Sequence, residues 1–369
     1  MSLRAVATAW NDFFFRPTSP LPVGLFRILY GCLVIANLIL LYPDWLTWFG
    51  TESWVSLSTM ATLEPGVRLN VFTIIPANDG WIRGFFWVSL ACGILLAAGL
   101  FTRISSMGVF LSLVSIHQRN VYILHGGDTF LRVAGFFLMF APAGAALSLD
   151  RLIRIRKGKE GSGLQSRPPW AQRMIQFELA LLYFVTFCWK ASGASWVNGT
   201  ALFYVIHLDE FRHFPVPTFL QNPMLLKLGS WLTLAVEFCL GVLIWFRELR
   251  YPLLATGVVF HLCLEYCLNI PLFQWEILSA YVLFIDPQDL ERIGKFFLKH
   301  HPKGLCSSDT SGNTLATEEF TEVGLGRTSS VSQNPENSSG SYLLRDVSCA
   351  IRSAVWRSGA SCTRVGPAH

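Results

Sequence analysis

Eight stretches of this sequence are apolar over about the length that a helix needs to cross a bilayer, some 20 residues for about 30 Å of hydrocarbon. Inside lipid a backbone must satisfy its own hydrogen bonds, which a helix does within a single segment. We therefore expect an all-α fold, a polytopic transmembrane helical bundle of six to eight spans, with eight preferred. The eight candidate spans are residues 21–41, 83–101, 104–118, 129–149, 173–193, 228–246, 251–269 and 272–286.

The composition agrees with a membrane protein and argues against several other classes. Hydrophobic residues make up 52% of the chain and charged residues only 14%, whereas soluble domains carry about 25% charged residues. The net charge of +5 comes from basic residues beside the apolar stretches, so we expect the lipid bilayer as partner and no nucleic acid. The sequence identifies no protein partner. None of the nine cysteines forms a CxxC pair, and we predict no metal site.

Basic residues predict the orientation of the chain, because loops retained in the cytoplasm are rich in Lys and Arg. Residues 151–173 form the most basic loop, which we place on the cytoplasmic side. With eight spans, both termini then lie in the cytoplasm. Two long outer loops remain, 42–83 and 194–227, of which the first carries four tryptophans typical of a membrane interface. We expect residues 1–301 to form the transmembrane domain and the polar segment 302–369 to be a disordered tail.

Several charged residues fall inside the apolar stretches, where charge is costly and often functional. We interpret Arg27 as a side chain that reaches out to lipid headgroups, and we expect Asp128 and Arg132, four residues apart, to neutralise each other. Glu237 lies too deep to reach an interface and should face a polar interior. Lys190 has two interpretations, since its position near the end of a span suits either an interfacial anchor or a functional site.

The predicted topology brings acid–base side chains to one face of the membrane, the non-cytoplasmic one. Lys190 and Trp196 follow the fifth span, His207 lies in the second outer loop, and His261 and Glu265 share the outer half of the seventh span. Imidazole, carboxylate and amine groups in one place are the composition of an acid–base site, although a hydrated vestibule has the same composition.

Four segments of the chain carry a resemblance to a known family. They are LFRILYGCL (25–33), HQRNVYILHGGDTFLR (117–132), KASGASWVNGTALFYV (190–205) and GVVFHLCLEYCL with QWEILSAYVLFI (257–285). In this order they resemble the HTTM family (horizontally transferred transmembrane domain), which is related to the membrane domain of vitamin K-dependent γ-glutamyl carboxylases. The resemblance implies a multi-pass helical domain and, for the carboxylases, lyase-type chemistry on the non-cytoplasmic side.

In those carboxylases a lysine deprotonates reduced vitamin K, and the resemblance gives Lys190 this role. His261, Glu265 and His207 become candidate partners of Lys190 in catalysis. The cofactor that the resemblance implies is a reduced, vitamin K-like quinone. The sequence departs from the carboxylase pattern at Ala191, where a second lysine is expected, and at Asn120, where a histidine is expected. The candidate substrate-binding residues are Trp196, Asn198, Gly199, Asn120 and His117.

Two functions that involve no catalysis remain open on the same residues. One is a carrier or proton-linked transporter in which four glutamates of the apolar stretches line a path. The other is a structural, partner-binding membrane module. The glutamates of the transport hypothesis are Glu178, Glu237, Glu265 and Glu276.

Overall fold

The chain folds into helices joined by short connections. The structure, a computed structural model, describes residues 2–66 and 68–300. Within these residues no strand forms, and two isolated bridges are the only β-type pairing, which confirms the all-α prediction. The chain divides into two compact units, Met1–Pro287 and Gln288–His369. The tail expected at 302–369 lies outside the described residues, so its start at 302 stays a prediction.

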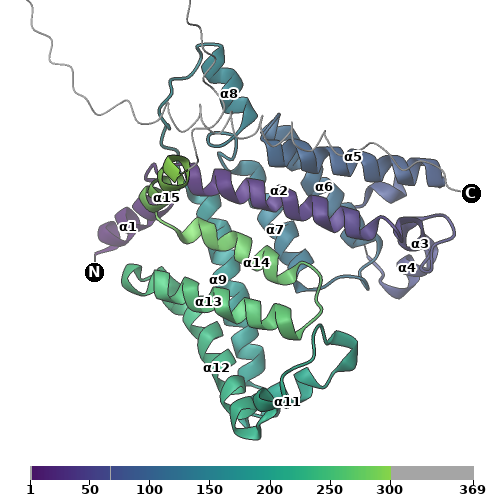
Figure 1. The fold of residues 1–369 in the computed structure, drawn as a ribbon. Coiled ribbons are helices and arrows are strands. Elements are labelled where there is room, and N and C mark those ends of the chain that lie inside the picture. Colours follow the sequence, from purple (N-terminus) through teal and green to yellow (C-terminus); the bar gives the residue numbers. More distant parts are fainter. Residues whose placement is uncertain (1, 67, 301–369) are drawn as a thin grey trace, which may run out of the picture. The chain divides into compact units, whose positions relative to one another are not determined.

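The chain contains long and short helices (Figure 1). The long ones are α2 (Leu21–Leu41), α5 (Asp79–Ala98), α6 (Thr102–Arg119), α7 (Gly126–Phe140), α9 (Trp170–Ala191), α12 (Pro223–Val242), α13 (Arg247–Cys267) and α15 (Pro287–His300). The short ones are α1 (Leu3–Phe15), α3 (Trp45–Phe49), α4 (Leu57–Leu63), α8 (Leu149–Arg156), α10 (Ala194–Val197), α11 (Ala201–Ile206) and α14 (Phe273–Tyr281). Five 3₁₀ turns complete them: η1 (Val71–Thr73), η2 (Asp209–Phe211), η3 (Thr218–Gln221), η4 (Leu243–Trp245) and η5 (Val282–Phe284).

Each of the eight predicted spans corresponds to a helix. Four segments are long and apolar enough to cross a membrane by length and composition, namely Leu21–Leu41, Asp79–Ala98, Trp170–Ala191 and Pro223–Trp245. The other four, α6, α7, α13 and α14, are shorter or more polar, and the count of six to eight spans stays a prediction. Segment 42–83 forms only α3, α4 and η1 before α5 begins, in agreement with its assignment as a connection.

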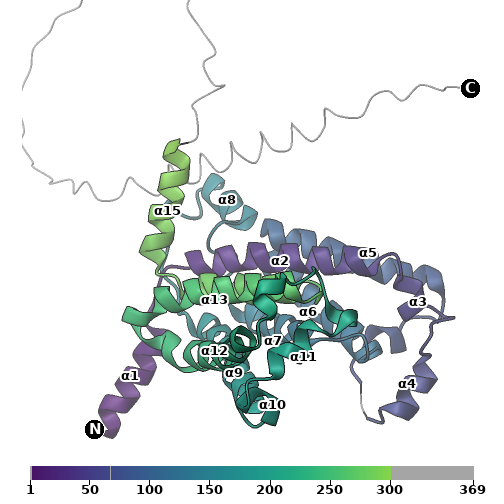
Figure 2. The ribbon, with the colours of Figure 1, turned by 60° about the horizontal axis from the view of Figure 1, so that its bottom comes forward.

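The helices pack in chain order, each long helix against the next. Contacts link α2 to α5, α5 to α6, α6 to α7, α7 to α9, α9 to α12 and α12 to α13. Helix α14 contacts α2, α7, α9 and α13, and six of its nine residues are buried. It is therefore an interior element, which explains why polar side chains occur on so short a helix. Figure 2 shows α10 and α11 beside the ends of α9 and α12, where the contacts place them.

The prediction that Arg27 reaches lipid headgroups is wrong. Its side chain is 0% exposed, and its Nη2 donates to the Leu147 carbonyl at 2.6 Å. Leu147 precedes α8 and Gly99 ends α5, so the guanidinium fills the space where these two loops meet. Gly99 has φ +69°, and a Cβ there would collide with Arg27. The Leu147 carbonyl gives Arg27 Nη2 a partner inside the protein, while Nε and Nη1 are buried without a hydrogen-bond partner in the described part of the chain.

Candidate functional site

Lys190 forms an ion pair with a carboxylate that is distant in the sequence. It lies in the last turn of α9, and its Nζ donates to Glu237 Oε1 on α12. The Glu237 side chain is 5% exposed and the Lys190 side chain 28%, so the pair is sealed on the carboxylate side and open on the amine side. Glu237 faces a polar neighbour, as predicted. Its second oxygen, Oε2, is buried without a hydrogen-bond partner.

The segment after α9 turns back over the Lys190 ammonium. Helix α10 places the Trp196 ring with its centroid 5.0 Å from Lys190 Nζ, a distance at which a cation is attracted to an aromatic face. The Trp231 indole of α12 donates to the Val197 carbonyl at 3.0 Å. The predicted Trp-Val-Asn-Gly turn is thus tied to the helix that supplies Glu237, which fixes Trp196 beside the lysine.

Gly199 closes this turn in a conformation that other residues rarely adopt. Its φ is +76°, and a Cβ at this position would collide with Lys227 of α12. Its carbonyl accepts from Ser230 Oγ at 3.3 Å. Only glycine meets both conditions without strain. Asn198, by contrast, is exposed and contributes through its backbone N–H, which donates to the Ala194 carbonyl at 2.8 Å.

His261 belongs to a buried chain of hydrogen bonds beside the ion pair. Its Nε2 lies 2.5 Å from the Tyr183 hydroxyl, which in turn lies 2.6 Å from the Tyr281 hydroxyl. Its Nδ1 lies 2.5 Å from Gln274 Oε1. Since an amide oxygen only accepts, Nδ1 carries the proton and Nε2 accepts from Tyr183. Tyr183 lies on α9 about two helical turns before Lys190, so this chain of hydrogen bonds is anchored on the helix that carries the lysine.

Two of the predicted partners of Lys190 lie elsewhere. Glu265 is half-buried, and its Oε1 accepts from the Trp275 indole at 3.3 Å. His207 is exposed, and its Nδ1 lies 2.7 Å from the Phe203 carbonyl. Neither side chain makes a hydrogen bond or an ion pair with Lys190 in the described part of the chain. His261 is thus the one of the three that the fold brings toward the lysine.

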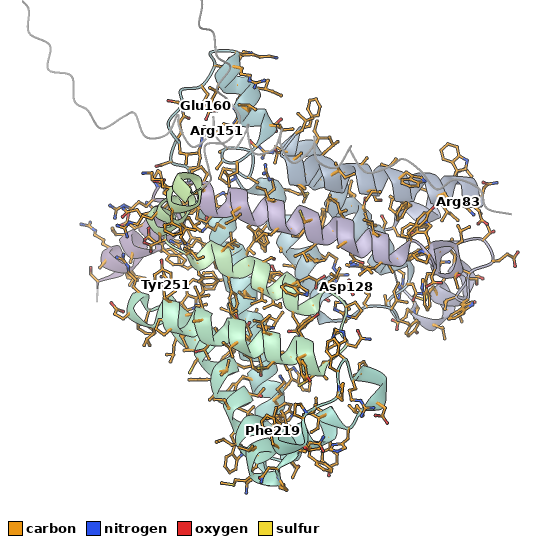
Figure 3. All side chains as sticks on the ribbon, viewed as in Figure 1. Arg83, Asp128, Arg151, Glu160, Phe219 and Tyr251 are labelled. Atoms are coloured by element: carbon orange, nitrogen blue, oxygen red, sulfur yellow. The ribbon has the colours of Figure 1, made fainter. Side chains whose placement is uncertain are left out.

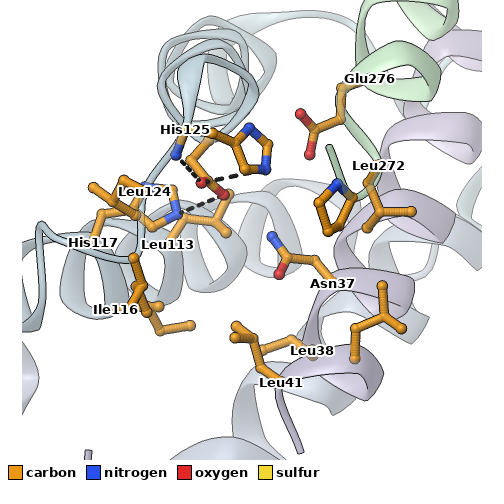
Figure 4. A pocket seen from close by; sticks show the side chains of 14 residues that line it. Asn37, Leu38, Leu41, Leu113, Ile116, His117, Leu124, His125, Leu272 and Glu276 are labelled. Carbon is orange, nitrogen blue, oxygen red and sulfur yellow. Dashed lines mark hydrogen bonds and ion pairs between the residues drawn. The ribbon is translucent and has the colours of Figure 1, made fainter. Parts of the chain in front are cut away.

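A second group of acid–base side chains lines a pocket of ≈ 260 Å³ between α2, α6, α7 and α14 (Figure 4). Asp128 accepts from the His125 backbone N–H at 2.9 Å, and one of its oxygens lies 3.6 Å from His125 Nε2. The other oxygen lies 3.6 Å from His117 Nε2. The predicted neutralisation of Asp128 by Arg132 is therefore wrong, because the two histidines are closer partners. Glu276 faces the same pocket, 0% exposed, with both oxygens unpartnered.

Asn120 and His117 were predicted to bind substrate, and both are buried at this end of α6. His117 lines the pocket, and its Nδ1 has no partner. Asn120 caps the end of the helix and accepts from the Tyr122 N–H at 3.1 Å. Sequence reasoning missed Gln274, Tyr183 and Tyr281, because a neutral side chain in an apolar helix carries no charge signal.

No cluster of three or more His, Cys, Asp or Glu side chains suited to a metal ion occurs within residues 2–66 and 68–300. Comparison with known proteins gives one family. The model of the HTTM domain matches residues 15–288, which is most of the chain and contains the whole region described above. No curated protein and no solved structure matches the chain. With four helices that are long and apolar enough to cross a membrane, the chain is a multi-pass integral membrane protein that belongs to the HTTM domain family.

Proposed function

We propose that this protein is a membrane enzyme in which Lys190 acts as a base on a reduced quinone at the non-cytoplasmic side. The observation that carries the proposal is the Lys190–Glu237 pair, with its amine side open and its carboxylate side sealed. The resemblance of residues 190–205 to the lysine segment of the vitamin K-dependent carboxylases supports the same role.

A lysine can accept a proton only when its amine is neutral. Proton transfer from Lys190 to Glu237 is a way to form that neutral amine. In water the ammonium keeps its proton at neutral pH. Beside a carboxylate that is almost fully removed from water, transfer of that proton to Glu237 replaces two buried charges with two neutral groups. The neutral amine of Lys190 is then available to accept a proton from a hydroxyl group, after which the pair carries one positive charge opposite the oxygen that lost the proton.

The residues around the pair fit a reduced quinone. Such a molecule has a flat aromatic ring and hydroxyl groups that donate hydrogen bonds. On the open, amine side of the pair, Trp196 presents a ring beside Lys190. A bound reduced quinone would supply the reducing power for a reaction with molecular oxygen. The protein contributes the base and the ordering of the ring.

His261 would act as a positioning residue in this proposal. The Gln274 and Tyr183 contacts hold its ring, and the Tyr183 hydroxyl connects it to the helix that carries Lys190. Glu265 and His207 have no place in it, because their contacts lie elsewhere. The pocket lined by His117, Asp128 and Glu276 is the candidate position for a second substrate.

The test is a titration of the purified protein in nanodiscs with reduced 2-methyl-1,4-naphthoquinone, following binding and oxygen uptake. We expect Lys190→Arg to keep the ion pair with Glu237 and to lose oxygen uptake above the uncatalysed rate, since a guanidinium stays protonated. Glu237→Gln should lose uptake as well, and Lys157→Ala, at the end of α8, serves as the exposed-lysine control. Absence of binding in the wild type, or full uptake in Lys190→Arg, would sink the proposal.

One observation favours a second candidate, a proton-linked carrier. Each of the four glutamates of the transport hypothesis has a buried oxygen without a partner; they are Glu178, Glu237, Glu265 and Glu276. Proton uptake into vesicles that contain the protein, followed with a pH-sensitive dye, tests this function. If the protein is a carrier, proton uptake should require no oxygen and should be lost in Glu178→Gln. If it is the enzyme, vesicles without quinone should show no change in the dye signal, and activity should require oxygen.

The orientation is part of the proposal, with both termini in the cytoplasm and Lys190 on the opposite side. Single cysteines placed at Ser195 and Ser166 test it with a membrane-impermeant thiol reagent, in a background in which the exposed native cysteines are replaced. We expect labelling from outside at 195 only. Labelling at 166 from outside would reverse the orientation.

A further inference from the structure

Three arginines from different elements line one pocket at the end of α9 that lies farthest from Lys190. Arg103 comes from the first turn of α6, Arg154 from α8, and Arg167 from the segment before α9. The pocket measures ≈ 450 Å³. Trp170, at the start of α9, also lines it, and the rise of about 1.5 Å per residue separates that end from Lys190 by some 30 Å. The pocket is therefore separate from the candidate site.

The carboxylates near the pocket are already engaged by protein groups. Asp150 accepts from the N–H groups of Phe101 and Thr102 at 2.9 and 2.8 Å, and from the Thr102 hydroxyl at 2.7 Å. Glu160 accepts from Arg151 and Arg154 at 3.2 and 2.7 Å. Neither carboxylate is ion-paired with Arg103 or Arg167 in the described part of the chain. Arg167 Nη2 donates to the neutral Gln165 Oε1 at 2.9 Å, so neither Arg103 nor Arg167 is neutralised by a carboxylate of the described residues, and Arg154 lines the same pocket.

The loop that presents Arg167 is held in place by its backbone. Thr18 N donates to the Arg167 carbonyl at 2.9 Å, and Arg167 N donates to the Thr18 carbonyl at 2.8 Å. The buried Arg151 donates to the carbonyls of Ser162 and Gly163 at 2.7 and 2.8 Å. Figure 3 labels Arg151 and Glu160 where α8 meets this loop. These hydrogen bonds fix the backbone of the loop that carries Arg167.

Thr102, Ser106 and Asp150 also line the pocket, while another part of its wall is apolar and lies next to exposed apolar side chains. Phe140 and Trp170 line it with their ring centroids 5.9 Å apart. Phe101 and Ile104, beside Arg103, are large exposed hydrophobic residues. A pocket with guanidinium groups at one side and aromatic rings at the other suits a molecule that has an anionic head and an apolar chain.

We propose that this pocket binds the headgroup of an anionic phospholipid, with the lipid phosphate between Arg103 and Arg167 and an acyl chain along Phe140 and Trp170. Guanidinium groups match phosphate oxygens in two-pronged geometry and are the usual choice for this contact. Basic pockets between helices at the membrane surface bind such headgroups. Free phosphate would use the arginines but not the aromatic side, so we commit to the lipid.

The test measures lipid retention by the full-length protein. The protein is purified from nanodiscs of phosphatidylcholine mixed with phosphatidylglycerol, and its bound lipids are identified by native mass spectrometry. We expect phosphatidylglycerol to be retained over phosphatidylcholine. Arg103→Gln with Arg167→Gln should weaken retention about fivefold for each arginine lost. Thermal unfolding in phosphatidylcholine alone verifies that this double variant is folded.

A matched control replaces two exposed arginines outside the pocket, Arg83→Gln with Arg212→Gln. Figure 3 labels Arg83 near the end of α5 that lies away from α8, and both arginines are exposed. The proposal is overturned if the control loses as much phosphatidylglycerol as the pocket variant, or if the wild type shows no preference. It is also overturned if inorganic phosphate displaces the lipid completely, since that result assigns the pocket to a free anion. Phe140→Ala, which leaves every arginine in place, should weaken lipid retention too.

Discussion

Lys190 on α9 and Glu237 on α12 form an ion pair across two adjacent helices, with the carboxylate almost fully buried and the amine partly open. The same two helices are joined again by the Trp231 to Val197 hydrogen bond. The turn that follows α9 is therefore positioned by the helix that holds the lysine's partner. A substitution that breaks either contact should therefore also disturb the other contact.

Removal of the Glu237 charge should destabilise the protein. Glu237→Gln leaves the Lys190 ammonium next to a neutral amide, and we expect a loss of about 2 kcal/mol in the free energy of unfolding. This figure lies below the 3–5 kcal/mol typical of fully buried pairs because Lys190 is partly solvated. Thermal unfolding in detergent measures it, with the exposed Arg212→Ala as control. The double variant Lys190→Met with Glu237→Leu should recover most of the loss, and a purely additive result would contradict the pairing.

Gly199 should tolerate no side chain. Gly199→Ala places a Cβ at a positive φ against Lys227, and we expect a cost of about 1–3 kcal/mol. The matched control is Gly161→Ala, since a Cβ at Gly161 meets no atom within 4 Å. Comparison of the two unfolding temperatures checks the prediction. Equal temperatures for both variants would show that the turn adapts without strain.

Loss of the Tyr183 hydroxyl should destabilise the protein, although the group is small. Tyr183→Phe leaves His261 Nε2 and the Tyr281 hydroxyl without their buried partner, and an unsatisfied buried polar group costs about 1–3 kcal/mol. We expect a lower unfolding temperature than in the wild type. Tyr204→Phe, at an exposed position, is the control. If both variants unfold at the same temperature as the wild type, the buried chain of hydrogen bonds contributes nothing measurable to stability.

Asp150 should make stability depend on acid pH. Partial burial alone would raise its pKa, but hydrogen bonds from Thr102 and Phe101 and the charge of Arg154 lower the pKa below the ordinary value of 3.8. A carboxylate with a lowered folded-state pKa stabilises the protein above its unfolded-state pKa, and this stability is lost as pH falls through the folded-state pKa. The unfolding temperature of Asp150→Asn should therefore fall less steeply below pH 3.8 than that of the wild type.

The control for this experiment is Asp12→Asn, which removes an exposed carboxylate from α1. Its unfolding temperature should follow the wild-type pH dependence. If the unfolding temperature of Asp150→Asn fell with pH as steeply as that of the wild type, the result would contradict the stabilising role of the Asp150 carboxylate. At neutral pH, Asp150→Asn should unfold at a lower temperature, because an amide replaces a charge-assisted acceptor by a weaker one.

The amino-acid sequence by itself determined the helical class, the positions of the eight helices, and the turn after Lys190. These follow from local rules, since apolar length, glycine and proline positions, and loop charge act within a few residues of one another. The sequence also indicated that Glu237 needs a polar neighbour and that Lys190 is a candidate for function, and its motifs carried the resemblance to the HTTM family.

Only the tertiary structure decided which groups meet. Lys190 and Glu237 are 47 residues apart, and a charge pattern gives the depth of a side chain in the membrane but not the neighbour that it faces. For the same reason Arg27 pairs with the Leu147 carbonyl rather than with lipid headgroups, and Asp128 with two histidines rather than with Arg132. A buried polar group takes the nearest partner that helix packing supplies, and packing is a property of the whole fold.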